Sequence, residues 1–245
     1  MAFFVLLGQR CLAQLPSTAG VELYSKLEFI SMPEKGKKSM ATYRLFIYYD
    51  GDEVICKKPV TFLIMHGEPV KGTNIIRQTV QKEIIKYQYM VFKKGEKYGC
   101  LFDSIGVKEP KRKLVDSFER ADLYKGFPFY TANDKLVKTN RNSAAGITEE
   151  IMQPLKQDDD TYPSSSHYYY KDDFKDIPYS FSEQLDKTHS GKLYKIRIVY
   201  DAQPKGKYAF VIPEYEYYFE LRMAPAAPEL TALLEKFKLF EAKQQ

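Results

Sequence analysis

The stretch that decides the fold is Lys192–Asp201, which reads KLYKIRIVYD. Its hydrophobic side chains occupy every second position, namely Tyr194, Ile196, Ile198 and Tyr200. Charged side chains, among them Lys195 and Arg197, occupy the opposite face. A period of two residues with one apolar and one charged face is typical of a strand in an antiparallel sheet that covers a core on one side.

Three further stretches repeat this pattern. Tyr215–Met223 reads YEYYFELRM and alternates apolar with charged residues. Val21–Ile30 and Ala41–Tyr49 do the same, and the Asp50-Gly51 pair that follows favours a tight hairpin turn. Shorter strands are predicted at 53–56, 60–65, 84–92 and 98–102, whereas 73–80 fits a strand or a helix.

The end of the chain predicts an amphipathic helix over Glu229–Ala242, whose apolar stripe is Leu230, Leu233, Leu234, Phe237 and Phe240. Burial of one such side chain contributes roughly 1.5–3 kcal/mol, so we expect the helix to dock, beside the row of Tyr194 and Ile196. The alternative is a free arm for a partner or a membrane surface. The predicted fold is mainly β or α+β: antiparallel sheets, arranged as a sandwich or half-barrel, with a C-terminal amphipathic helix packed on the sheet.

The middle of the chain has a weaker pattern. Residues 127–186 are rich in Asn, Asp and Ser, so we predict a long polar loop region there, interrupted by a short helix at Thr148–Met152. A longer helix is predicted at Lys113–Tyr124. No internal repeat or clear boundary occurs, so residues 14–245 are predicted to form a single β-rich domain.

The composition bounds the function. The chain has 245 residues, of which 37 are basic and 32 acidic, with a formal net charge of +5. Nucleic-acid-binding proteins usually carry a clustered basic face, and here the charges are evenly mixed, so no nucleic-acid partner is expected. No stretch reaches the roughly 20 apolar residues of a membrane-spanning helix, so we expect no transmembrane span.

The first residues favour export. Residues 2–7 read AFFVLL, and Cys11 and Ala13 are small residues at the positions that a signal peptidase recognises. We interpret residues 1–13 as an export-signal remnant and expect a periplasmic or cell-surface location. The alternative is that this segment is the first strand or helix of the folded protein.

Two cysteines remain after that segment, Cys56 and Cys100. In an exported protein they could form a disulfide, and the loop that it closes would contribute about 4 kcal/mol. The alternative is a pair of buried thiols.

Familiar catalytic motifs are absent from the sequence. It contains no GxGxxG, GxxxxGK[ST], HExxH or GxSxG pattern, and only three histidines. We therefore expect no cofactor and favour a non-catalytic protein. The carboxylates Asp158, Asp159 and Asp160 could bind a hard cation such as calcium, although a solvated acidic loop is the simpler interpretation.

The segment His167-Tyr168-Tyr169-Tyr170 is the candidate ligand site. Exposed tyrosines beside small polar residues are typical of surfaces that recognise a sugar or a protein. The competing interpretation is a short strand with Tyr168 and Tyr170 directed into the core and Tyr169 outward.

An acidic row offers the one enzymatic hypothesis. Glu214, Glu216 and Glu220 would share a strand face, about 7 Å apart for each two-residue step. Paired carboxylates of this kind could serve a hydrolase of the envelope.

The Leu12-Ala13-Gln14 end of the export segment, the phrase Pro178-Tyr179-Ser180-Phe181-Ser182 and the Tyr- and Glu-rich last strand together suggest a family. The chain resembles the exported, uncharacterised β-rich proteins of Bacteroidota, of which the GLPGLI family is one example, although the string that names that family is absent. This resemblance implies an extracytoplasmic location and transfers no site residue. We therefore expect an exported, non-catalytic envelope protein that binds or scaffolds another envelope protein or a glycan.

Overall fold

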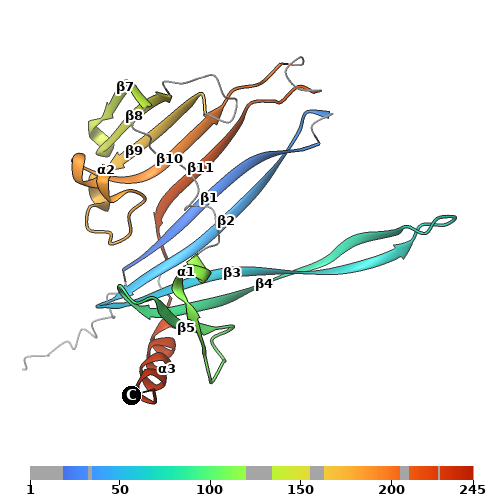
Figure 1. Ribbon diagram of the computed structural model, residues 1–245, viewed down its shortest axis with the longest axis vertical. Coiled ribbons are helices and arrows are strands. Elements are labelled where there is room, and N and C mark those ends of the chain that lie inside the picture. The colour runs from blue at the N-terminus through green and yellow to red at the C-terminus, as the bar shows by residue number, and fades with distance from the viewer. Residues whose placement is uncertain are drawn as a thin grey trace, which may run out of the picture.

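A computed structural model describes residues 19–32, 35–119, 134–154, 163–204, 210–225 and 227–244. Its strands form one antiparallel sheet in the order β6-β5-β4-β3-β2-β1-β11-β10-β9-β8-β7 (Figure 1). The strands are β1 (Ala19–Met32), β2 (Lys37–Asp50), β3 (Glu53–Pro69), β4 (Ile76–Lys93), β5 (Tyr98–Phe102), β6 (Lys111–Leu114), β7 (Asp134–Asn142), β8 (Ile147–Pro154), β9 (Ser165–Lys171), β10 (Lys192–Tyr200) and β11 (Tyr215–Met223). The helices are α1 (Val115–Glu119), α2 (Glu183–Thr188) and α3 (Leu230–Ala242), with short 3-10 turns at Ser143–Ala145 and Asp172–Phe174.

The order of the strands follows from two meanders. The chain starts at the centre with β1 and moves strand by strand to the edge at β6. It resumes at the opposite edge with β7 and returns to the centre with β11. The prediction of antiparallel strands with a C-terminal helix packed on the sheet is confirmed, and the strands form one continuous sheet.

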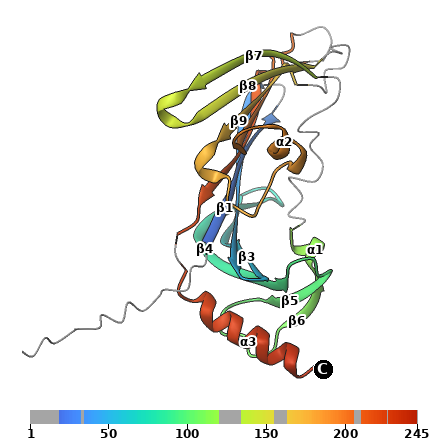
Figure 2. The ribbon, with the colours of Figure 1, turned by 90° about the vertical axis from the view of Figure 1, so that its left-hand side faces the viewer.

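Alternation of side chains gives the sheet two different faces. On one face, which we call the α2 face, apolar residues of the central strands meet α1, α2 and the segment 174–181. Figure 2 shows α1 and α2 on the same side of the sheet. Leu23, Leu221 and Phe219 are at most 1% exposed there, so the α2 face holds the main core.

The other face, called the α3 face, has a buried apolar cluster where α3 covers it. Leu230, Leu233 and Phe237 pack against strand residues that include Tyr48 and Phe102. Outside the apolar contact, Lys57 Nζ lies 2.7 Å from a carboxylate oxygen of Glu229 at the start of the helix.

The predicted position of this helix was wrong. Tyr194, Ile196 and Ile198 belong to the α2 face, on the opposite side of the sheet from α3. The apolar stripe of the helix requires burial, but it does not specify which of two apolar surfaces provides it.

Between β2 and β3 the sheet forks. The two strands pair only from Phe46 with Lys57 to Asp50 with Glu53, and beyond that point β3 pairs with β4 alone. The part of this hairpin beyond the fork, residues 58–88, is called the arm, and it extends away from the rest of the chain (Figure 1). The two short strands predicted at 53–56 and 60–65 are therefore one strand, and the ambiguous segment 73–80 lies largely in β4.

Three strands occupy much of the region 127–186 for which a long polar loop was predicted. They are β7, β8 and β9, and the segment predicted as a short helix at Thr148–Met152 lies within β8. Polar residues dominate β7 because it is the exposed edge of the sheet. The helix predicted at 113–124 is one short turn, α1, as far as residue 119, and the remainder of that prediction lies outside the described residues.

The disulfide considered between Cys56 and Cys100 is not formed. Both are buried thiols. Cys56 packs on the α2 face, whereas Cys100 packs against the helix on the α3 face, and β4 separates their strands. Burial, with a smaller contribution from the Glu241 carboxylate, raises the pKa of the Cys100 thiol to about 11. Both residues act as core side chains.

Docking of α3 predicts unequal effects for two leucines of the same helix. Leu233 is fully buried, whereas Leu239 is 65% exposed. Leu233→Ala should lower the free energy of unfolding by roughly 2–5 kcal/mol, because it removes buried methyl groups and leaves a cavity. Leu239→Ala should change it by less than about 0.5 kcal/mol. Chemical denaturation of both variants measures the difference, and equal midpoints would contradict the docking of α3.

Candidate binding face

Beyond α3, the α3 face of the sheet is covered with polar and aromatic side chains. The strand registers align seven of them in one row across seven strands: Arg44, Tyr24, Glu220, Lys195, Tyr169, Glu149 and Asn140. A second row lies beside the first and contains Lys26, Tyr218, Arg197 and His167. Together with Glu22, Glu28, Ser165, Glu216 and Arg222, these residues define what we call the open face.

Cations stacked on tyrosine rings hold the open face together. The guanidinium carbon of Arg222 lies 3.7 Å from the ring centre of Tyr24. The Lys195 ammonium lies 4.2 Å from the ring centre of Tyr169 and 5.3 Å from that of Tyr218. Such contacts contribute about 0.5–1 kcal/mol at exposed sites. They fix the tyrosines as flat, ordered surfaces.

The carboxylates of the open face are paired as well. Arg197 Nε lies 2.6 Å from Glu216 Oε2, and Arg222 Nε lies 2.5 Å from Glu220 Oε2. Arg44 pairs with Glu22, and Lys38 pairs with Glu28. No described helix contributes a partner to the charged groups of the open face, so the network is built by the strands alone.

This pairing bears on the paired-carboxylate hypothesis. Glu216 and Glu220 lie on the open face as the alternation predicts, but each has its own arginine, and Glu214 is exposed before β11 begins. A general acid in glycoside hydrolysis needs a raised pKa. The described carboxyl groups whose pKa departs clearly from its ordinary value all depart downward: Glu28, Asp103, Glu149 and Glu229.

Among these four carboxyl groups, Glu149 has the most strongly lowered pKa. Asn140 donates to Oε2 of Glu149 at 2.8 Å, and His167 Nδ1 lies 3.0 Å from Oε1. Burial alone would raise the pKa of Glu149, but hydrogen bonds from Asn140, His167 and Tyr169 outweigh it and bring the pKa to about 2. Burial, together with the hydrogen bond to this carboxylate, raises the pKa of the Tyr169 hydroxyl.

Ser165, His167 and Glu149 form a hydrogen-bonded chain. His167 Nε2 lies 3.3 Å from Ser165 Oγ while its Nδ1 faces Glu149. This order of groups occurs in serine hydrolases, which also need N–H donors that stabilise an oxyanion. Ser165 lies in the regular ladder between β9 and β10, and no described helix begins beside it on this face. The chain of contacts can orient side chains, but it lacks a visible oxyanion site in the described residues.

The predicted ligand segment is divided between the two faces. Tyr168 and Tyr170 are buried in the core of the α2 face at 1% and 3% exposure, which matches the competing interpretation. His167 and Tyr169 are half-buried on the open face. Asp158, Asp159 and Asp160 lie outside the described residues. Within the described ranges, no three His, Cys, Asp or Glu residues are arranged to hold a metal ion.

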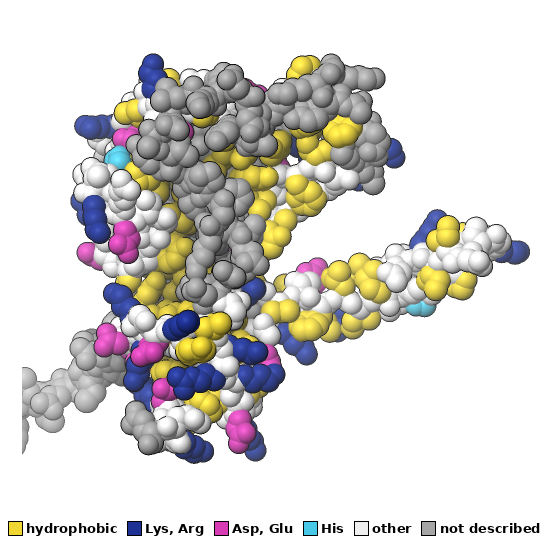
Figure 3. All heavy atoms as spheres, in the orientation of Figure 1, with side chains coloured by type: hydrophobic (Ala, Val, Ile, Leu, Met, Phe, Trp, Pro, Cys, Tyr) yellow, Lys and Arg dark blue, Asp and Glu magenta, His cyan; other side chains and the backbone are white. Residues whose placement is uncertain are grey.

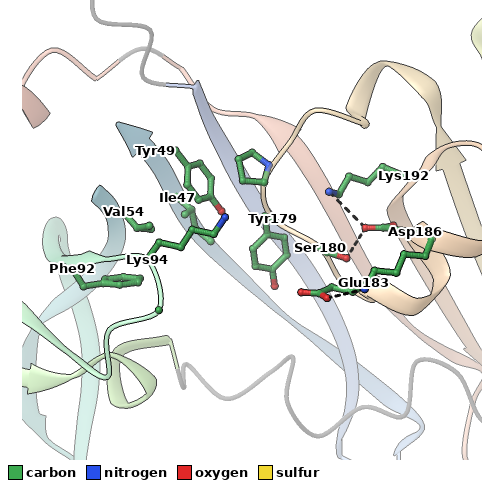
Figure 4. A pocket seen from close by; sticks show the side chains of 13 residues that line it. Ile47, Tyr49, Val54, Phe92, Lys94, Tyr179, Ser180, Glu183, Asp186 and Lys192 are labelled. Carbon is green, nitrogen blue, oxygen red and sulfur yellow. Dashed lines mark hydrogen bonds and ion pairs between the residues drawn. The ribbon is translucent and has the colours of Figure 1, made fainter. Parts of the chain in front are cut away.

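A hollow of about 450 Å³ lies on the α2 face between the β2–β4 end of the sheet and α2 (Figure 4). Its apolar side is formed by Ile47, Tyr49, Val54 and Phe92. On its polar side, Ser180 donates to Asp186 at 2.5 Å and the Lys192 ammonium lies 3.6 Å from the same carboxylate. Asp186 also accepts a hydrogen bond from the backbone N–H of Leu193 at 2.9 Å. The Asp186 carboxylate therefore links α2 to β10.

A second, more polar hollow of about 600 Å³ lies near the β7–β8 turn. His189 stacks on Tyr170, with ring centres 4.0 Å apart. Its Nε2 lies 3.0 Å from Glu150 Oε2, and its Nδ1 lies 2.8 Å from the Leu185 carbonyl oxygen. Both ring nitrogens are therefore engaged within the fold.

Sequence patterns could not identify most of the open face. Tyr24, Glu149 and Asn140 are far apart in the chain, and only the register of successive strands aligns them. The usable signal was the alternation within each strand, which assigned Lys195 and Arg197 to one face correctly.

The lowered pKa of Glu149 predicts a dependence of stability on pH. Because the folded pKa lies below the ordinary value of 4.5, ionised Glu149 stabilises the fold above that pH, and this contribution disappears as the pH falls toward about 2. Glu149→Gln should therefore lower the free energy of unfolding near neutral pH by roughly 1–3 kcal/mol, allowing for partial solvent screening, and the difference should shrink toward pH 2.

The matched control is Glu183→Gln, whose side chain is 82% exposed. Urea denaturation of both variants across the pH range measures the effect. A pH-independent difference between Glu149→Gln and the unaltered chain would contradict the electrostatic role of Glu149.

None of the helices in the described part of the chain has the length and apolarity that crossing a bilayer requires. Comparison with known protein-family models finds no match, and no curated protein is significantly similar in sequence. The interpretation of the open face therefore depends on its own geometry.

Proposed function

We propose that this chain is an exported, non-catalytic protein of the cell envelope that binds or scaffolds a partner protein on its open face. The observation that carries the proposal is the row of tyrosines and paired charges across seven strands. The export and the envelope location come from residues 1–13 and from the resemblance described above, and these residues lie outside the described ranges.

The composition of the open face supports a protein as the partner. Tyrosine and arginine are enriched at protein interfaces, and tyrosine supplies a large contact area with few rotatable bonds. Tyr24 and Tyr169 are already held by Arg222 and Lys195, so little conformational entropy remains to be lost on binding. An anionic glycan would favour an excess of unpaired cations, and the arginines here face carboxylates.

Site-specific photo-crosslinking in the producing cell tests this proposal. A photoreactive residue at Tyr218, on the open face, should yield a crosslinked product that contains a second protein. The control position is Leu239, which is 65% exposed on the outer side of α3. Crosslinks of equal yield from both positions, or none from Tyr218, would contradict a binding role for the open face. The partner is then identified by mass spectrometry of the product.

The hydrogen-bonded chain of Ser165, His167 and Glu149 favours a second candidate function, an acyl hydrolase of the envelope. Because no described oxyanion site accompanies it, our proposal predicts that a fluorophosphonate probe does not label the folded chain. Labelling that disappears in Ser165→Ala and persists in Ser164→Ala would replace the binding function with the hydrolase. Ser164 is a suitable control because its hydroxyl donates to the Val199 carbonyl instead of contacting His167.

A further inference from the structure

The arm is a two-stranded ribbon that lacks support from the rest of the sheet. β3 has 17 residues and β4 has 18, whereas strands usually have 3–10. Every residue from Thr61 to Pro69 is exposed, and Figure 3 shows the arm clear of the rest of the molecule. An isolated two-stranded hairpin is marginally stable in water at best, and three or more strands with an apolar face are needed for stability.

One edge of the arm differs from the other strand edges. The outermost strand β6 carries Lys111, Arg112 and Lys113, and the opposite edge strand β7 carries Lys135, Lys138 and Arg141. The β4 edge of the arm carries Arg77, Lys82 and Lys86. Lysine and arginine on an edge discourage pairing with another chain. The β3 edge from Pro59 to Gly67 reads PVTFLIMHG and contains no Lys, Arg, Asp or Glu.

The arm carries exposed apolar side chains on both of its faces. On the face that continues the α3 face, Leu63, Met65, Val80 and Ile85 are between 43% and 55% exposed. On the reverse face, Phe62 and Ile64 are 49% and 44% exposed. Exposed apolar patches of this extent mark sites of association.

We propose that the arm pairs with the arm of a second copy of this chain. The two β3 strands run antiparallel about a two-fold axis within Val60–Met65 and form a four-stranded sheet in the order β4-β3-β3-β4. A second copy fits because its β3 edge is equally uncharged, so the identical segments meet without like-charge repulsion. In this arrangement each β4 lies on the outer side of its own β3, away from the partner.

A lipid bilayer would be a less favourable partner for the arm than a second copy of the chain. An open ribbon in hydrocarbon would leave the outer N–H and C=O groups of both strands without partners, at several kcal/mol each. Strand pairing with a second copy satisfies these groups along β3 and extends the apolar surface at the same time.

Sedimentation velocity over a concentration series tests the pairing. The unaltered chain should form a dimer, and Leu63→Lys should weaken it at least about tenfold, because it introduces charges where two identical strands meet. The matched control is Val80→Lys, since Leu63 and Val80 are both 54% exposed but Val80 lies on β4. It should change the dissociation constant by less than about threefold, because β4 does not meet the partner strand in this arrangement. A monomer at every concentration, or equal weakening by both substitutions, would overturn the proposal.

Disulfide trapping provides a readout of geometry. Single cysteines are introduced at Thr61, Phe62, Leu63 and Ile64 in a Cys11→Ser chain, in which Cys56 and Cys100 remain buried. At least one β3 position should give a covalent dimer on mild oxidation, whereas a cysteine at Ile85, on β4, should not. Trapping through Ile85 and not through β3 would overturn the two-fold pairing. Neither result depends on the partner of the open face, so failure here is distinguishable from failure of the binding function.

Discussion

The pairing of β1 with β11 is the contact on which the rest of the structure depends. Seven residue pairs join the two strands, from Val21 opposite Met223 to Leu27 opposite Tyr217. Among the described strands, the first meander, β1 to β6, and the second, β7 to β11, share no other ladder. Leu23 and Leu221 lie directly opposite each other and are 1% exposed, so the joint also lies at the centre of the core. Without it the chain would form two separate sheets.

The register of this joint determines the open face. Side chains alternate along a strand with a period of two, so a slip of one residue would exchange the two faces of one meander. Tyr24 lies opposite Glu220, which places the Arg222 guanidinium over the Tyr24 ring and continues the row to Lys195. The hydrophobic partners on the reverse face stabilise the same register, since Phe219 is completely buried there. Core packing and the polar rows therefore specify one alignment.

Sequence could predict the strands that have one buried face, because burial of that face makes apolar and polar residues alternate along the strand. β10 and β11 each have one buried and one polar face, and their alternation is visible in the sequence. β7 and β8 lie at the polar edge, where Thr148, Glu149 and Glu150 look like the first turn of a helix. The polar side chains of β7 and β8 are at least partly exposed, so local pattern could not distinguish these strands from a loop. The predicted ligand segment is a strand, and side chains of a strand alternate between the two faces of the sheet. Tyr168 and Tyr169 therefore lie on opposite faces and do not form one site.

The central claim, that one register joins the two meanders, is tested most directly by backbone NMR of the isotope-labelled chain. Our account predicts cross-strand NOEs between Leu23 and Leu221 and between Ser25 and Phe219, the pairs that face each other in the ladder. NOEs confined to the ladders within each meander, with none between β1 and β11, would contradict it and would separate the open face into two unrelated surfaces.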